Sequence, residues 1–275
     1  MRKKQKMKLV FYFSVLSILF TGCKSYIQVF ETETTNAEKE GEFYVYETDT
    51  VKITYTFWSK KGIVSFAVLN KLDMPIYIDW KKSSYIDNSN KLNYWVDEEI
   101  SKSAGYYGGY FYSGPLVKPG FSISEGIGVT NVTKVKTERI TFIPPKANYY
   151  RSQFHLLPIP YYQFDLNSEY TDTNMPYNPR KKTRVYHKRF TKENSPLVFR
   201  NFLAFSLTED FENEFYIDNE FYLSKMLEMD YEHFKYQEKD ERGNYRDIKP
   251  YKKQTSFYLY VPRENSIDYR KKWGN

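Results

Sequence analysis

Alternation of apolar and polar residues is the feature that most constrains how this chain folds. In "VKITYTFWS", apolar side chains occupy every second position from Val51 to Phe57. Successive side chains of a strand point to opposite faces, so a period of two predicts a strand with one buried face. "GIVSFAVLN" and "IYIDW" show the same period, and "KLDMP" between them supplies a turn. The inward positions of these two runs are Val64, Phe66, Val68, Ile76, Ile78 and Trp80.

Later segments repeat the pattern. "ERITFIPPK" places a strand before the rigid pair Pro144-Pro145, "LVFRNFLAFSL" alternates from Phe199 to Leu207, and "SFYLYV" adds a strand near the C-terminus. Aromatic residues make up 19% of the chain and tyrosine alone numbers 28. Aromatic and β-branched side chains suit a half-buried pleated surface, so composition supports the same interpretation. The sequence therefore predicts an all-β fold, an antiparallel β-sandwich with long Pro-rich and charged loops.

Residues 209–234 fit two interpretations. Their apolar positions suit a hairpin that turns at Asp218-Asn219, or a helix with one apolar stripe. The stripe would contain Phe211, Phe215, Tyr222, Met226 and Met229. Of the two, we favour strands from Glu220 to Leu227.

Half of the prolines lie close together in the middle of the chain. Six of the twelve are found between residues 144 and 179. Proline lacks the N–H that a central strand donates, so this stretch is predicted to be loop or edge, either a crossover between sheets or a domain boundary. We favour the crossover near 144–179 within one domain at 43–263, followed by a polar C-terminal tail at 264–275.

The N-terminus has the pattern of a secretory signal peptide. Five basic residues precede an apolar and small-residue run from Leu9 to Phe20. As a helix these twelve residues span about 18 Å, against roughly 30 Å of bilayer hydrocarbon, so they do not predict a transmembrane anchor. "FTGC" then delivers the only cysteine, Cys23, and resembles the bacterial lipoprotein signal, although Phe20 stands where an aliphatic residue is commonest. The alternative is an ordinary cleavage site beside an incidental thiol.

The lipoprotein signal implies removal of residues 1–22 and acylation of Cys23. Residues 23–42 contain only the short apolar piece "YIQVF" and are otherwise polar, so a lipidated, flexible tether is expected there. The whole chain has 41 basic and 34 acidic residues, and the leader removes five basic ones and no acidic one, which leaves 36 and 34. The mature chain is thus nearly neutral, and we expect no nucleic-acid partner. Without a second cysteine, no disulfide framework is expected.

A family resemblance rests on several blocks in order. After the Cys23 signal come "YIQVFET", "YETDTVKITYTFWSKKGIVSFAVLNKLDMPIYIDW", "ITFIPPK", "ENSPLVFRNFLAFS" and "NEFYIDNEFYLSKM". This succession resembles a group of uncharacterised lipoproteins of Bacteroidota. The resemblance implies an envelope lipoprotein with an immunoglobulin-like sandwich, anchored to the outer membrane. In that phylum, surface export is associated with acidic residues after the cysteine. Here Lys24-Ser25-Tyr26-Ile27 follow, which favours the periplasmic face.

No local motif for catalysis, a cofactor or a metal ion is present. The three histidines, His155, His187 and His233, are far apart in the sequence, and no HExxH, CxxC or HxH spacing occurs. The glycines of "YYGGYFYSG" match neither GxGxxG nor a phosphate-binding loop. Adjacent Asp97, Glu98 and Glu99 point to alternate faces if extended, so a turn is expected there.

Two stretches are candidate contact sites. Aromatic side chains beside Gly108-Gly109 can stack on sugars or dock a protein, or can cover their own sheet as an irregular hairpin. The tyrosines are Tyr106, Tyr107, Tyr110 and Tyr112. The run "RKKTRVYHKR" can meet lipid phosphates or anionic glycans, or form a solvated loop. Its basic residues are Arg180, Lys181, Lys182, Arg184, Lys188 and Arg189.

These features favour a non-enzymatic envelope lipoprotein that binds a protein partner or glycan, or maintains the envelope. Two alternatives stay open. A glycan-acting hydrolase requires two carboxylates at a suitable separation across a cleft. An accessory subunit of a transport or secretion assembly requires a fixed partner.

Overall fold

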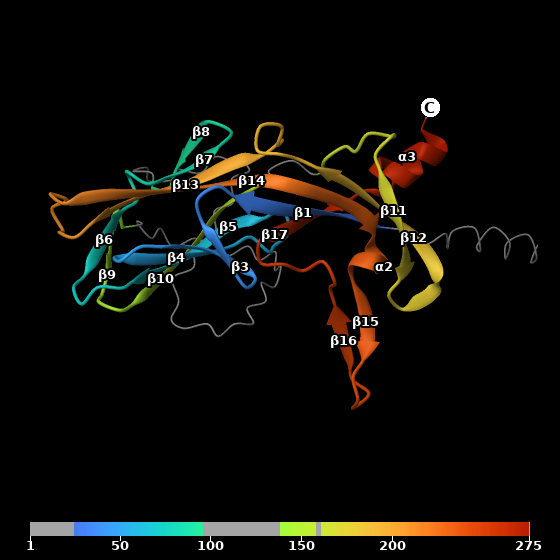
Figure 1. Ribbon diagram of the computed structural model, residues 1–275, viewed down its shortest axis with the longest axis horizontal. Helices are drawn as coiled ribbons and strands as arrows, with labels where there is room; N and C mark the ends of the chain where they lie inside the picture. Colours follow the sequence, from blue (N-terminus) through green and yellow to red (C-terminus); the bar gives the residue numbers. More distant parts are fainter. Residues whose placement is uncertain (1–24, 96–137, 158–160, 275) are drawn as a thin grey trace, which may run out of the picture.

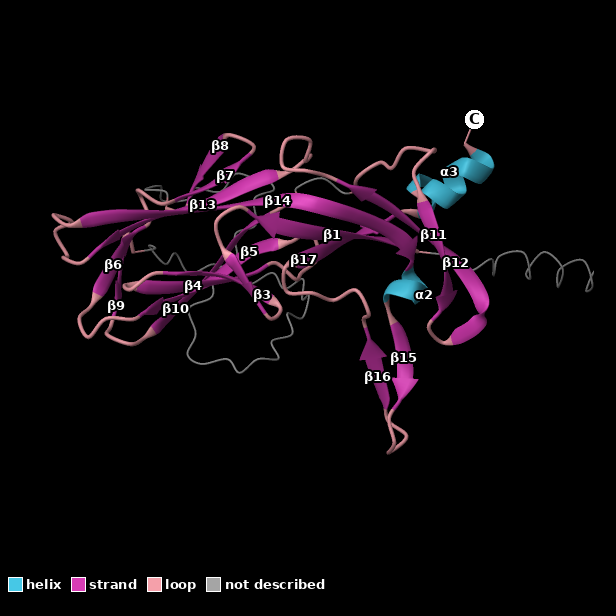
Figure 2. Cartoon of the chain, viewed as in Figure 1, coloured by secondary structure: helices cyan, strands magenta, loops and turns pink. Residues whose placement is uncertain are grey.

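The computed structural model describes residues 25–95, 138–157 and 161–274. Within these residues the chain is nearly all antiparallel β-structure, arranged as two large sheets and one projecting hairpin (Figures 1 and 2). The predicted all-β sandwich is confirmed, and the immunoglobulin-like topology stays a prediction.

The larger sheet is organised around one long strand, β14 (Glu214–Asp230). One edge of β14 pairs with β13 (Val198–Ser206) and then with β12 (Asn178–Arg189), and the other edge pairs with β1 (Tyr26–Thr34). The remaining strands extend from these: β17 (Ser256–Val261) beside β1, β11 (Tyr170–Met175) beside β12, β6 (Ile76–Asp79) and β7 (Ser84–Asp87) beside β13, β9 (Ile140–Ile143) beside β6, and β8 (Asn90–Asn93) beside β7.

The smaller sheet has five strands. Their order is β10 (Asn148–His155), β5 (Ile63–Asn70), β4 (Val51–Thr56), β3 (Phe43–Glu47) and β2 (Glu38–Glu40). In β4 and β5 the burial of side chains alternates residue by residue, as the sequence period predicts. β10 and β11, which lie within the Pro-rich stretch 144–179, are both edge strands. Edge strands tolerate proline, because a missing N–H there breaks no pairing inside the sheet.

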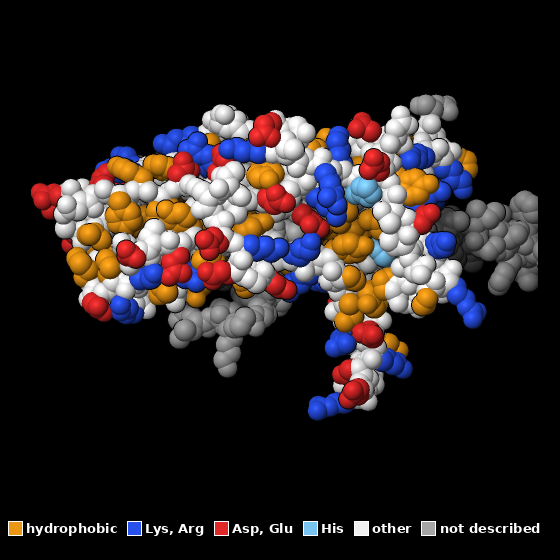
Figure 3. All heavy atoms as spheres, viewed as in Figure 1, with side chains coloured by type: hydrophobic (Ala, Val, Ile, Leu, Met, Phe, Trp, Pro, Cys, Tyr) orange, Lys and Arg blue, Asp and Glu red, His pale blue; other side chains and the backbone are white. Residues whose placement is uncertain are grey.

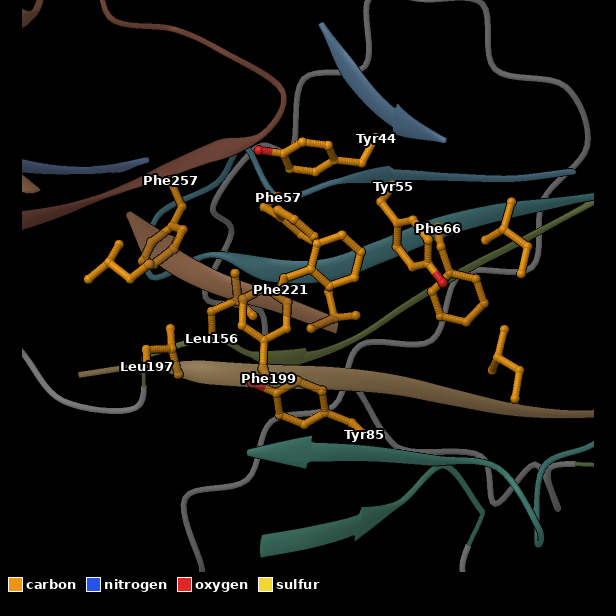
Figure 4. Close-up of a cluster of buried hydrophobic side chains, with 14 of the residues drawn as sticks. Tyr44, Tyr55, Phe57, Phe66, Tyr85, Leu156, Leu197, Phe199, Phe221 and Phe257 are labelled. Atoms are coloured by element: carbon orange, nitrogen blue, oxygen red, sulfur yellow. The ribbon is translucent and has the colours of Figure 1, made fainter. Parts of the chain in front are cut away.

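Aromatic side chains from both sheets fill the main core (Figure 4). Phe57, which follows β4, meets Phe199 of β13 and Phe221 of β14 with ring centroids 5.2 to 5.3 Å apart in each pair. The hydroxyl of the fully buried Tyr55 donates to Asn219 Oδ1 at 2.7 Å and accepts from Asn201 Nδ2 at 3.1 Å. This polar contact joins the two sheets and fixes their register inside the core.

A second, smaller core covers the opposite face of the larger sheet where β1 begins. It contains Ile27, Val29, Val185, Leu227, Met229 and Phe234. Phe234 belongs to the short helix α2 (Tyr231–Phe234), which leads into the hairpin of β15 (Tyr236–Lys239) and β16 (Tyr245–Ile248). This hairpin, the arm, projects from the body in Figure 2.

The expected tether and polar tail are both corrected. Residues 26–34, placed within a flexible segment at 23–42, form β1, which is paired on both edges. β1 and β2 also belong to the two sheets, so the folded body begins before residue 43. At the other end, the 3₁₀ turn η1 (Arg263–Asn265) and the helix α3 (Ile267–Trp273) replace the expected tail, and Ile267 is fully buried.

The interpretation of residues 209–234 is partly right. Residues Glu220 to Leu227 are strand, as favoured, but the expected turn at Asp218-Asn219 is wrong because β14 runs through it. Asn219 is buried and bonded to Tyr55, and Asp218 pairs with Arg200 across to β13, with Nη2 and Oδ2 2.6 Å apart. These contacts outweigh the turn preference of the Asp-Asn pair.

Candidate functional site

Three of the sequence predictions lie outside the described residues. These are the acylation site Cys23, the tyrosines Tyr106, Tyr107, Tyr110 and Tyr112, and the acidic triplet Asp97, Glu98 and Glu99. They stay predictions.

The start of β1 lies at one end of the larger sheet. Tyr26 pairs with Asp230 on one side and with Val261 on the other. The carbonyl of Ser25 already accepts a hydrogen bond from the N–H of Tyr231, at 2.9 Å. Burial, followed by the nearby Asp268, raises the pKa of the Tyr26 hydroxyl to about 12. The chain is thus fixed in the fold from its first described residue.

The basic run at 180–189 is a strand, β12, so the expected loop is wrong, while the first residues of the run are exposed to solvent. Its last residues, Tyr186 to Arg189, pair with β14, and the rest of β12 pairs only with β11. Tyr186 lies opposite Glu228, so Arg184 lies at the level of Asp230 and the start of β1. The part that carries Arg180 and Lys182 therefore extends beyond the last residue of β14 and the first residue of β1.

The six basic side chains of this run do not share one environment. Lys181 Nζ lies 3.2 Å from Glu232, and its hydrogen bonds to the Tyr177 hydroxyl and to Glu232 raise its pKa to about 12. Lys188 Nζ lies 3.4 Å from Asp165, and Arg184 lies 4.0 Å from Asp172. Among the described residues, no carboxylate lies within 4 Å of the other three, which are Arg180, Lys182 and Arg189.

Helix α3 adds cations and an aromatic ring to the same end of the molecule. Lys271 Nζ lies over the ring of Tyr186, 4.9 Å from its centroid, and over that of Tyr170 at 5.6 Å. The guanidinium of Arg184 also lies over the ring of Tyr170, 4.9 Å from its centroid. Trp273 is 62% exposed. We name this surface the basic end; it consists of Arg180, Lys182, Arg184, Lys271, Lys272 and Trp273. Figure 3 shows Lys and Arg side chains over the β11–β12 hairpin and α3.

A buried carboxylate holds α3 in place. Glu228 Oε1 accepts from the N–H of Ile267 at 2.7 Å, and its Oε2 accepts from Gln28 Nε2 at 2.8 Å. Gln28 in turn accepts from the N–H of Tyr162 at 2.8 Å. Burial raises the pKa of Glu228, in spite of these hydrogen bonds. Helix α3 and the segment that begins at Tyr161 are thus hydrogen-bonded to the larger sheet through Glu228 and Gln28. No sequence motif distinguishes these two residues.

Two surface pockets bring charged residues together. The first, of about 320 Å³, is lined by Glu31, Glu33, Lys39 and Lys253 among others. Glu31 lies 2.9 Å from Lys253 Nζ, and Glu33 accepts from the Tyr222 hydroxyl at 2.6 Å. Both carboxylates of this pocket therefore have a described partner. The second, of about 620 Å³, has the mixed lining Asp165, Asn167, Ser168, Glu169, His187, Lys188 and Arg189.

The three histidines have separate partners. His155 Nδ1 meets the carbonyl of Gly62 at 3.3 Å, and His187 Nε2 meets the hydroxyl of Thr171 at 3.4 Å. His233 Nε2 lies 2.6 Å from the Tyr251 hydroxyl, and burial lowers the pKa of both His155 and His233. In the part of the chain that the structure describes, no group of three or more His, Cys, Asp or Glu residues could hold a metal ion.

Comparison with protein-family models, curated proteins and solved structures finds no match to this chain. Among the described residues, no helix combines the length and apolar character needed to cross a bilayer.

Proposed function

We propose that this protein is a cell-envelope lipoprotein, anchored through acylated Cys23, whose β-sandwich body is a non-enzymatic binding or structural module. A place on the periplasmic face of the outer membrane, and membership of the Bacteroidota lipoprotein group, are parts of the same proposal. The observation that supports it is the N-terminal sequence, in which a basic and apolar leader is followed by "FTGC" with Cys23.

The position of β1 limits how far the body can lie from its anchor. Only Lys24 and Ser25 stand between Cys23 and β1. At 3.3 to 3.6 Å per residue, Cys23 reaches no more than about 11 Å from Tyr26. An acyl group on Cys23 therefore holds the body against the bilayer instead of on a long spacer. Two or more acyl chains make that attachment stable.

Acylation is tested by growing cells with a radioactive fatty acid. The proposal predicts that the wild-type protein carries the label and stays with membranes after a carbonate wash. A Cys23→Ser variant is expected to lose the label, and Ser25→Ala is the matched control, since the serine contributes only its backbone carbonyl to a described contact. An unlabelled wild-type protein, or one released by carbonate, would refute the anchor.

The arm supports the alternative of an accessory subunit in an assembly. Within the described part of the chain its two strands pair only with each other, and Tyr245 is 65% exposed. Tyrosine offers apolar area with a polar tip and is common where proteins meet. Replacing residues 237–247 with a short turn is expected to release a fixed partner in membrane pull-downs, while Lys91→Glu on β8 leaves it bound. A partner retained without the arm would count against this surface.

A further inference from the structure

We propose that the basic end is a docking surface for an anionic lipid bilayer, which orients the body on the membrane with α3 and the tip of the β11–β12 hairpin toward the headgroups. This inference rests on the proposed anchor at Cys23 and adds a second, separate contact with the same membrane.

The register of the sheet places this surface beside the anchor. Asp230 of β14 pairs with Tyr26 of β1, and Tyr26 pairs with Val261 of β17. β17 leads directly through Pro262 and η1 into α3. On the other side of β14, the level of Asp230 is that of Arg184 on β12. The start of β1, helix α3 and the β11–β12 hairpin therefore share one end of the molecule, as Figure 1 shows.

The side chains at this end have the chemistry of a membrane interface. Trp273 is 62% exposed, and Lys272 Nζ lies 5.0 Å from the centroid of its ring. Tryptophan favours the headgroup level, because its ring is apolar and its N–H is polar. Lysine and arginine are attracted to anionic headgroups at short range, and each contributes about five-fold to binding near the surface.

Two lysines at this end are available for lipid phosphates. The carboxylate of Asp268 accepts from the Tyr186 hydroxyl at 2.7 Å. Among the described residues, Lys182 and Lys272 have no carboxylate within 4 Å. Such cations keep their full attraction for a bilayer of opposite charge.

Helix α3 presents these residues from a fixed position. The Ser266 hydroxyl accepts from the N–H of Tyr269 at 3.4 Å, and Ile267 is buried and bonded to Glu228. A fixed helix binds without the entropic cost of ordering a flexible tail. The short link from Cys23 brings this end to the membrane, and the exposed side chains give it a preferred orientation there.

The test uses the full acylated protein in vesicles of phosphatidylcholine, with or without about one quarter phosphatidylglycerol. Brominated lipids quench tryptophans at the headgroup boundary, and Trp273→Phe identifies the share due to that residue. We expect quenching by Trp273 to be several-fold stronger in the anionic vesicles at low salt, and to weaken at high salt.

Matched charge reversals isolate the surface. Lys182→Glu/Lys272→Glu is expected to reduce the equilibrium constant for docking on anionic vesicles by more than about twenty-five-fold. Lys39→Glu/Lys91→Glu on β2 and β8 is expected to leave it unchanged, and melting curves check that both variants fold. Quenching of Trp273 that is absent, or equal in both lipid mixtures, overturns the inference. Release of the protein from neutral vesicles instead indicates that the anchor has failed, so the two proposals fail separately.

Discussion

Replacing Phe30 with alanine tests whether β1 is part of the folded core. The side chain is fully buried, and its ring stacks on that of Phe257 with centroids 4.9 Å apart and planes 5° apart. Its backbone lies between Met226 of β14 and Phe257 of β17. Removal of the ring thus leaves a cavity where three strands of the larger sheet meet.

The expected cost follows from burial and from the lost ring contact. Complete burial of a phenylalanine side chain contributes about 1.5 to 3 kcal/mol, and the cavity adds to the loss, so Phe→Ala in a core costs about 3 to 5 kcal/mol. The stacked pair with Phe257 accounts for about 0.5 to 1.5 kcal/mol of this. For a chain of this size, the melting temperature is expected to fall by about 6 to 20 °C.

The assay is urea unfolding of the unacylated mature chain, followed by tryptophan fluorescence and far-ultraviolet circular dichroism. Glu38→Ala, on an exposed position of β2, is the control, and we expect it to change the free energy of unfolding by no more than about 0.5 kcal/mol. A Phe30→Ala variant that loses less than about 1 kcal/mol would show that residues 26–34 behave as a tether, and the reasoning would be refuted.

Two further predictions concern buried titratable groups. Glu228→Ala leaves the N–H of Ile267 and the amide of Gln28 without their acceptor. We therefore expect the free energy of unfolding to fall by about 2 to 4 kcal/mol and α3 to be cleaved rapidly by a protease. A variant in which α3 stays protected from the protease would contradict this role. Burial lowers the pKa of His233 in the folded protein, so the unfolded chain takes up a proton first as pH falls below about 6.5, and stability is lost from there down through the lower, folded pKa. We expect unfolding curves of wild type and His233→Gln at pH 7 and 5.5 to show a smaller loss in the variant, and an equal loss would exclude His233 as a cause. Glu228, whose pKa is raised, acts in the opposite direction and is present in both proteins.

The sequence period was enough to predict most strands that have one buried face. In β4, β5 and β13, buried residues alternate with more exposed ones over at least part of the strand, and these strands were found. β1 was missed because both of its faces are buried from Tyr26 to Phe30. Ile27 and Val29 pack in the second core, whereas Phe30 packs in the main core. A strand covered on both faces shows no alternation, and the acidic and threonine residues after Phe30 suggested a polar linker.

The candidate surface could be predicted only in part. The basic run was visible as a cluster of charges, but its pairing with β11 and the position of its tip depend on the sheet as a whole. Only one of the seven residues of helix α3 is buried, so the sequence shows no repeat of apolar residues at helical spacing there. Its position depends on Glu228, a residue 39 positions earlier in the chain. Contacts at that separation follow from the tertiary fold and leave no local signal.

Hydrogen exchange at the amides of residues 26–31 tests most directly whether the anchor joins a central strand without a spacer. Each of these residues pairs with both β14 and β17, so every amide faces a carbonyl partner. In the acylated protein, we predict exchange as slow as that of the core residues of β14, limited by unfolding of the whole body. Exchange within seconds, at the rate of an unstructured peptide, would contradict the account.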